Sequence, residues 1–145
     1  MKTMMCIPAA IMAAVMLSSC DGTTTSENAQ ARVDAAKQMT ADSNAELMMQ
    51  NAQNYCASCA SYGVKLQSGR YAGSLDRASD TPAFDGSRSD FDKAFDTYTN
   101  GMTSGYYAVM IDNGAPTAAY WSESDLSSVD FKNIPEGMVV GVKIQ

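Results

Sequence analysis

The stretch that decides the fold is SNAELMMQNAQNYCASCASY, residues 43–62, which carries the clearest helical pattern in the chain. Its apolar side chains recur at steps of four and three residues, and this spacing places them on one face of an α-helix. Those side chains are Met48, Ala52, Tyr55, Cys59 and Tyr62, with Leu47 and Cys56 beside them. Asp42 or Ser43 can cap the start of this helix, and Gly63 fits its end.

From residue 105 onward the apolar period changes to two, which is the pattern of β-strands. Asp112-Asn113-Gly114 is a strong hairpin signal, because a type I′ turn needs backbone conformations that Asn and Gly tolerate. We expect antiparallel strands over residues 106–111, 117–121 and 138–144. The alternation in the last strand assigns four residues to one buried face: Met138, Val140, Val142 and Ile144.

The chain between the helix and these strands is less regular. Residues 64–73 suggest a short extended piece, and residues 74–89 a polar loop. A second, short helix is expected to begin at Ser89 and to stop at residues 100–101, with Phe91, Phe95 and Tyr98 on one face. The sum is an α+β fold: a long N-terminal amphipathic helix packed on a small, three-stranded antiparallel β-meander. Neither element can shield its apolar face alone.

The first twenty residues have the pattern of a targeting segment. Residues 4–17 follow Lys2 and carry no charge; they are too few to span a bilayer, which needs about twenty residues, but they suit a signal peptide. The LSSC sequence at residues 17–20 resembles the lipobox of bacterial lipoproteins. That resemblance implies cleavage after Ser19 and a diacylglyceryl group on the sulfur of Cys20. An ordinary secretory signal that is cut nearby is the alternative.

Two acyl chains anchor a protein stably. The lipobox therefore predicts a protein held on a membrane surface outside the cytoplasm, on the outer leaflet of the cell membrane in a Gram-positive host. The chain then divides into a signal peptide (residues 1–19), a polar tether that can be helical (residues 20–42) and a folded domain (residues 43–145). A weak helical stripe within the tether consists of Val33, Ala36 and Met39.

The order of elements resembles the ectodomain of type IV pilin-like proteins of Gram-positive gut bacteria. The stretches that carry the resemblance are DSNAELMMQNAQNY at residues 42–55, SGRYAG at residues 68–73 and GYYAVMIDNGAPTAAYWS at residues 105–122. The resemblance implies a pilin-like α+β domain that works by adhesion or by assembly with other envelope proteins. Residues 1–40 depart from the pilin pattern, because they lack its processing Gly, methylated Phe and Glu within a long apolar helix. This departure puts polymerisation into a filament in doubt.

The composition excludes several classes of site. The chain has no His, which removes Ser-His-Asp and Cys-His nucleophiles, HExxH zinc sites and c-type haem. Its net charge of −6 argues against a nucleic-acid partner. It has neither a Gly-rich phosphate loop nor a GxSxG elbow. We therefore expect no catalytic residue, no metal and no cofactor.

Cys56 and Cys59 form a CxxC pair late in the expected helix. In thioredoxin-like enzymes such a pair opens a helix, and the helix N-terminus lowers the thiol pKa. Here the pair lies near the opposite end of the helix, and no strand precedes it. A local disulfide formed outside the cell is our prediction. Two inert reduced thiols on the apolar face, and a redox or metal role, are the alternatives.

Six Asp residues fall within residues 76–96, and the part from Asp85 to Asp92 superficially suggests a calcium loop. An EF-hand loop needs Gly at its sixth position, where this chain has Asp90. We therefore interpret the segment as a solvated loop.

Four aromatic residues cluster on the expected hairpin, as the two adjacent pairs Tyr106–Tyr107 and Tyr120–Trp121. Because side chains alternate along a strand, the two members of each pair point to opposite faces of the sheet. At most half of them can therefore be exposed if one face packs on the helix. Exposed members could contact a sugar or a protein partner, and the candidates are Tyr106, Tyr120 and Trp121. Core packing and ordinary cross-strand pairing are the plainer interpretation.

These features predict a non-catalytic, lipid-anchored cell-surface protein that works by adhesion or by interaction with envelope proteins. Its expected partners are the membrane, through a lipid on Cys20, and an envelope protein or a glycan. One alternative is a glycan-binding module that uses the hairpin aromatics. Another is an extracytoplasmic thiol-disulfide protein that uses Cys56 and Cys59.

Overall fold

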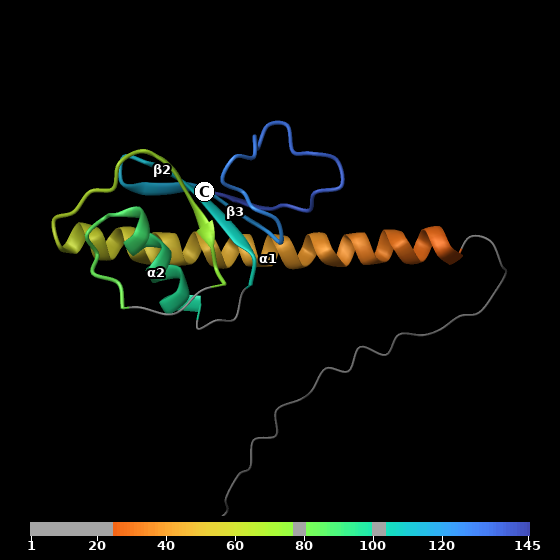
Figure 1. Ribbon diagram of the computed structural model, residues 1–145, viewed down its shortest axis with the longest axis horizontal. Coiled ribbons are helices and arrows are strands. Elements are labelled where there is room, and N and C mark those ends of the chain that lie inside the picture. The colour runs from red at the N-terminus through yellow and green to blue at the C-terminus, as the bar shows by residue number, and fades with distance from the viewer. Residues whose placement is uncertain (1–24, 77–80, 100–103) are drawn as a thin grey trace, which may run out of the picture.

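The computed structural model describes residues 25–76, 81–99 and 104–145, and it shows an α+β fold (Figure 1). The elements in chain order are α1 (Thr25–Ser61), β1 (Gly69–Ser74), α2 (Arg88–Thr99), β2 (Tyr106–Asp112), β3 (Ala115–Ser122) and β4 (Gly141–Ile144). The predicted combination of a long helix and an antiparallel sheet is confirmed.

Helix α1 is continuous for 37 residues and begins at Thr25. The helix does not start at the caps that Asp42 or Ser43 offer; it starts earlier, as the weaker stripe of Val33, Ala36 and Met39 indicates. Residues 25–42 contain neither Gly nor Pro and are rich in Ala, Gln, Lys and other helix formers, so nothing in them interrupts the helix. The helix runs through residue 42 into the domain without a break.

The end of α1 lies where the sequence predicts it. Gly63 has a φ of 75°, the left-handed conformation that glycine adopts most easily. The N–H of Gly63 donates to the carbonyl of Ala60 at 3.0 Å, and the N–H of Val64 donates to the carbonyl of Cys59 at 2.9 Å. Together these bonds form a Schellman motif, which satisfies the last carbonyls of the helix.

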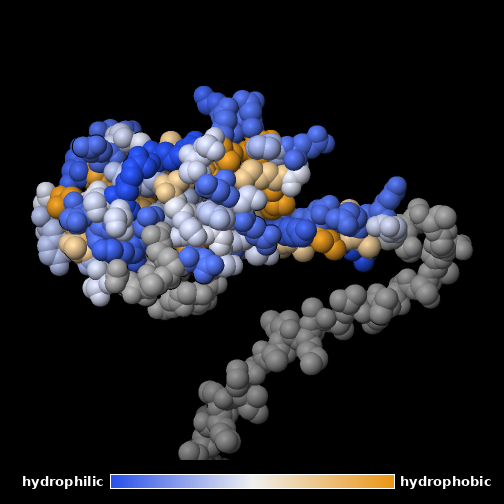
Figure 2. All heavy atoms as spheres, in the orientation of Figure 1, coloured by the Kyte–Doolittle hydropathy of each residue, from blue (hydrophilic) through white to orange (hydrophobic). Residues whose placement is uncertain are grey.

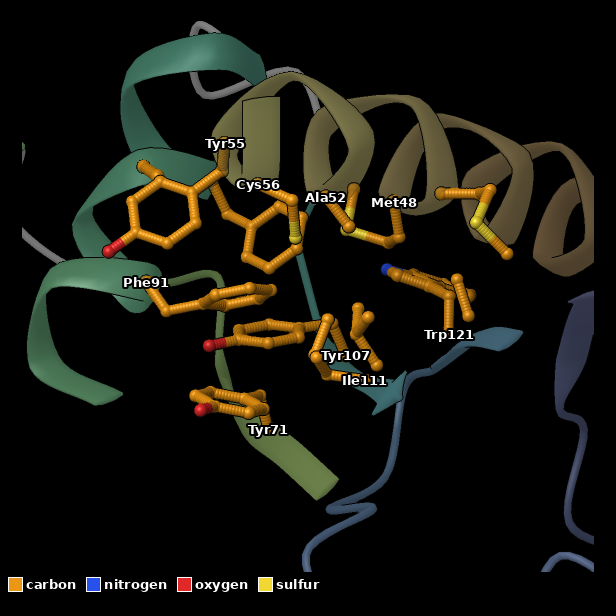
Figure 3. Close-up of a cluster of buried hydrophobic side chains, with 14 of the residues drawn as sticks. Met48, Ala52, Tyr55, Cys56, Tyr71, Phe91, Tyr107, Ile111 and Trp121 are labelled. Carbon is orange, nitrogen blue, oxygen red and sulfur yellow. The ribbon is translucent and has the colours of Figure 1, made fainter. Parts of the chain in front are cut away.

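The predicted apolar face of α1 is buried except at its last member. Figure 3 shows side chains of this face pointing toward aromatic residues of α2 and the sheet. The buried members are Met48, Ala52, Tyr55 and Cys59. Tyr62 is 69% exposed, because the helix ends before it, and its ring stacks on Phe84 with 5.7 Å between ring centroids.

The sheet has four strands in the order β1-β2-β3-β4, and all neighbours are antiparallel. The expectation of three strands is wrong, because residues 69–74 pair with β2 along their whole length. The hairpin between β2 and β3 is confirmed. Asn113 and Gly114 have φ angles of 52° and 84°, which is what a type I′ turn requires.

Strand β4 is shorter than expected, and its apolar side chains are only partly covered. Of the four residues predicted to share a buried face, Val140 is buried and Met138 is half-buried, whereas Val142 and Ile144 are 37% and 69% exposed. The physical reason is that β4 is an edge strand, and the cluster that covers Val140 does not include the last residues of the strand.

Helix α1 crosses the β4 edge at close range. A Cβ atom on Gly141 would lie 1.8 Å from a backbone oxygen of α1, so the helix can approach this closely only because residue 141 is glycine. Nearby, Gln38 Nε2 donates to the carbonyl of Val140 at 2.9 Å, and Asp42 Oδ1 accepts the N–H of Val142 at 3.2 Å. These two side chains form hydrogen bonds with backbone groups that an edge strand would otherwise leave unpaired.

Helix α2 begins earlier than expected. Ser87 precedes its first residue, and Ser87 Oγ accepts a backbone N–H of the first turn at 3.1 Å, as an N-cap does. The predicted start at Ser89 is therefore wrong, and the predicted stop at residues 100–101 lies outside the described residues. Phe91 and Phe95 are each 1% exposed, so the predicted apolar face of α2 is buried at these two positions.

The sheet carries an apolar layer on each face. On the face toward α1 and α2, Tyr107, Val109 and Trp121 join the main core (Figure 3). The chain between β3 and β4 covers part of the opposite face, where Leu126 and Val140 pack into a second cluster. The blue loop in Figure 1 is this segment.

Candidate functional site

The first part of α1 is exposed to solvent. Every residue from 26 to 40 is exposed, and Figure 1 shows the start of α1 reaching beyond the rest of the molecule. These fifteen residues span about 22 Å of helix. Figure 2 shows a narrow, mostly hydrophilic projection, although Val33 and Met39 are 48% and 72% exposed. The beginning of this exposed segment (residues 26–40) thus extends beyond the folded body, whereas its later residues lie beside the body, where Gln38 donates to Val140.

The predicted cleavage site at Ser19 and the predicted lipidation site at Cys20 lie outside the described residues. Helix α1 begins only five residues after Cys20. Among the described residues, no helix is both long and apolar enough to cross a bilayer.

Cys56 and Cys59 are buried in the main core, where they are 6% and 0% exposed. Both are free thiols in the structure, so it does not contain the predicted disulfide. Burial raises the pKa of the Cys56 thiol to about 11, and burial also raises the pKa of the Cys59 thiol. Because the thiolate is the reactive form, this environment suits inert side chains better than redox chemistry.

A buried hydrogen-bond network links α1 to α2, and sequence reasoning missed it. Asp90 is 2% exposed, and its Oδ2 accepts the hydroxyl of Tyr55 at 2.7 Å. The carboxylate also accepts the N–H groups of Ala83 at 2.6 Å and Asp85 at 3.3 Å. Burial and the bond to Asp90 raise the pKa of the Tyr55 hydroxyl. The available signal was the Ser87-x-x-Asp90 spacing of an N-cap: Ser87 Oγ accepts the Asp90 N–H, but the Ser87 N–H donates to Asp85, so the reciprocal bond of a capping box is not formed.

The acidic stretch at residues 76–96 forms no metal site in the described part of the chain. There, no group of three or more Cys, Asp or Glu side chains comes together as metal ligands would. Asp90 instead accepts the hydrogen bond from Tyr55 that links α2 to α1. Asp85 Oδ1 accepts the N–H of Ser87 at 2.8 Å. Asp80 and the side chain of Asp96 lie outside the described part.

The candidate ligand-contact aromatics do not form one surface. Trp121 is 6% exposed in the main core, and its Nε1 donates to the carbonyl of Ser104 at 2.8 Å. Tyr106 and Tyr120 are half-buried in the second cluster, on the other face of the sheet. The ring of Tyr120 stacks on that of Phe131 with 3.7 Å between centroids. The prediction that alternation separates Tyr120 from Trp121 is confirmed.

Two hollows lie far apart along α1. One, of about 440 Å³, lies between the exposed segment and the chain around residues 122–124 and 137–139. The other, of about 360 Å³, lies beyond the C-terminal end of α1, between residues 64–71 and residues 85–88. The second is lined mostly by polar and charged side chains, among them Lys65, Asp85 and Arg88.

Comparison with known proteins gives no match: no family model, no curated protein and no solved structure is significantly similar to the chain.

Proposed function

We propose that this chain is a non-catalytic, lipid-anchored cell-surface protein whose pilin-like domain acts by adhesion or by interaction with other envelope proteins. The observation that carries the proposal is the exposed start of α1. It follows the predicted lipid site at Cys20 within a few residues and leads directly into the folded body. A lipid at Cys20 would therefore hold the body away from the membrane on a helical spacer.

The arrangement of α1 supports the likeness to pilin ectodomains. Its C-terminal half packs on an antiparallel sheet, while its N-terminal part is exposed. The exposed segment is polar, however, with Glu27, Arg32, Asp34 and Lys37 along it. A filament core would need an apolar helix there, so the proposal is limited to display at the membrane.

The chemistry of the core favours a binding role over a catalytic one. The only two cysteines of the described part are buried, and burial raises the pKa of both thiols. The buried carboxylate of Asp90 accepts hydrogen bonds from the Tyr55 hydroxyl and from two backbone N–H groups. Neither arrangement leaves a reactive group open to a substrate.

Membrane fractionation of two cysteine variants tests the anchor. Cys20→Ala removes the acceptor of the lipid, and Cys6→Ala is the matched control because it lies inside the apolar segment of the predicted signal. We expect the wild type and Cys6→Ala to enter the detergent phase after labelling with a radioactive fatty acid, and Cys20→Ala to carry no label. Equal labelling of Cys20→Ala and the wild type would refute the proposal.

A further inference from the structure

The hollow at the end of α1 has two cations on its wall. It is bounded by the chain from Val64 into β1, which contributes Lys65, and by the chain around the start of α2, which contributes Arg88. Neither cation forms an ion pair with any residue in the described part of the chain. Two positive charges that form no ion pair within the described residues, in one hollow of about 360 Å³, favour an anionic group on a ligand.

Each of these cations lies against a neighbouring part of the protein. The guanidinium of Arg88 lies 5.2 Å from the centre of the Tyr71 ring, within the range of a cation–π interaction. Tyr71 is fixed in turn, because its hydroxyl donates to the carbonyl of Gln67 at 3.1 Å. The stem of Lys65 lies against the β2–β3 turn, since a Cβ on Gly114 would meet Lys65 Cγ at 3.0 Å.

The hollow also contains a carboxylate, Asp85. Hydrogen bonds from Ser87 hold the pKa of Asp85 below its usual value, so it stays negative at neutral pH. With Asp85 the three ionised groups of the hollow sum to +1, so a monoanion matches the hollow better than a dianionic phosphate does. A ligand that carries both a carboxylate and hydroxyl groups would also use Asp85, because sugar hydroxyls can donate to a carboxylate.

We infer that this hollow binds an acidic saccharide of the hexuronic-acid class. Its carboxylate would accept hydrogen bonds from Lys65 and Arg88, and its ring hydroxyls would donate to Asp85. The side chain of Gln67, which is exposed at the wall of the hollow, offers a further donor and acceptor. The charges of the three ionised groups sum to +1, which matches one uronate.

The position of the hollow fits display, and this part of the inference rests on the proposed function. The 37 residues of α1 separate the chain that precedes Thr25 from the hollow by about 55 Å of helix. A protein anchored through Cys20 would therefore present the hollow at its membrane-distal end. The hollow itself does not depend on the anchor.

Calorimetric titration of the full chain in detergent with trigalacturonic acid tests the inference. We expect saturable binding of this probe and no binding of the neutral galactose trisaccharide. Arg88→Gln and Lys65→Gln should each weaken binding by about tenfold or more, because each removes a charged hydrogen bond. Lys132→Gln is the matched control, since Lys132 is an exposed cation outside the hollow and its loss should leave binding unchanged.

Asp85→Asn separates a saccharide site from a simple anion site. It should weaken trigalacturonate binding, because the amide of Asn offers the sugar hydroxyls one neutral acceptor oxygen in place of the two charged oxygens of a carboxylate, whereas an anion site would bind inorganic phosphate and bind it more tightly in this variant. Phosphate binding of that kind, equal affinity for the neutral sugar, or an unchanged affinity in Arg88→Gln would each overturn the inference. Circular dichroism melts confirm that every variant is folded. The titration needs no membrane, so its failure and the failure of the lipid-labelling experiment are distinguishable.

Discussion

Replacement of Gly141 by Ala should separate α1 from the sheet edge. The new Cβ would lie 1.8 Å from the carbonyl oxygen of Ala41 and 2.6 Å from the N of Asp42. These are backbone atoms of a helix, so no side-chain rotation can relieve the overlap, and α1 must move outward.

The cost can be worked from the contacts that this movement would strain. Overpacking in a closely packed interface costs about 1–3 kcal/mol. The bonds from Gln38 to Val140 and from Val142 to Asp42 contribute about 1 kcal/mol each. We therefore expect Gly141→Ala to lower the free energy of unfolding by about 3–5 kcal/mol, a large part of the roughly 5–15 kcal/mol that holds a typical domain folded.

Urea unfolding followed by far-UV circular dichroism measures this change, with the fluorescence of the single, buried Trp121 as a second probe. Gly137→Ala is the control, because a Cβ there meets no atom within 4 Å and only the positive φ of 80° is unfavourable. We expect it to cost about 1 kcal/mol. A Gly141→Ala protein that is no less stable than Gly137→Ala would refute the close helix–edge contact.

Three further changes probe the core and the second cluster. Tyr55→Phe should lower the free energy of unfolding in urea by about 1–3 kcal/mol, because buried Asp90 loses a hydrogen-bond donor. Burial raises the pKa of the Cys56 thiol from its ordinary value of 9.0 to about 11 in the folded state. The wild type should therefore lose about 2–3 kcal/mol of stability relative to Cys56→Ala between pH 9 and 11, as the unfolded chain releases this proton first. Phe131→Ala removes the ring that stacks on Tyr120, so amide exchange over residues 123–140 should quicken by about tenfold.

A specific result would contradict each of these three predictions. Equal stability of Tyr55→Phe and the wild type would mean that the hydroxyl does not stabilise Asp90. A pH dependence that is the same with and without Cys56 would contradict its burial as a thiol. Exchange that quickens equally throughout β1 and β2 would show global destabilisation in place of local release of the loop.

The spacing of apolar residues was sufficient to predict the elements whose apolar residues lie on one face. The helical steps from Met48 to Cys59 and the turn at Asn113-Gly114 depend only on neighbours along the chain, and both are confirmed. Strand β1 was harder to recognise, because in GRYAGS only Tyr71 is buried. Its strand conformation depends on pairing with β2, which lies more than thirty residues later.

The remaining differences come from tertiary contacts that one sequence does not reveal. The exposure of Ile144 depends on β4 being the edge strand. The network of Tyr55 and Asp90 joins residues 35 positions apart. The hollow with Lys65 and Arg88 forms only because the chain leading into β1 and the chain at the start of α2 meet near the end of α1.

The central claim is that the mature chain begins at a lipidated Cys20 and carries its folded body on the start of α1. The most direct measurement is the intact mass of the protein taken from its native membrane, before and after reduction and alkylation. The account predicts the mass of residues 20–145 plus a diacylglyceryl group, with two thiols that alkylate only after unfolding and need no prior reduction. An unlipidated mass, or a chain that still contains residues 1–19, would contradict it.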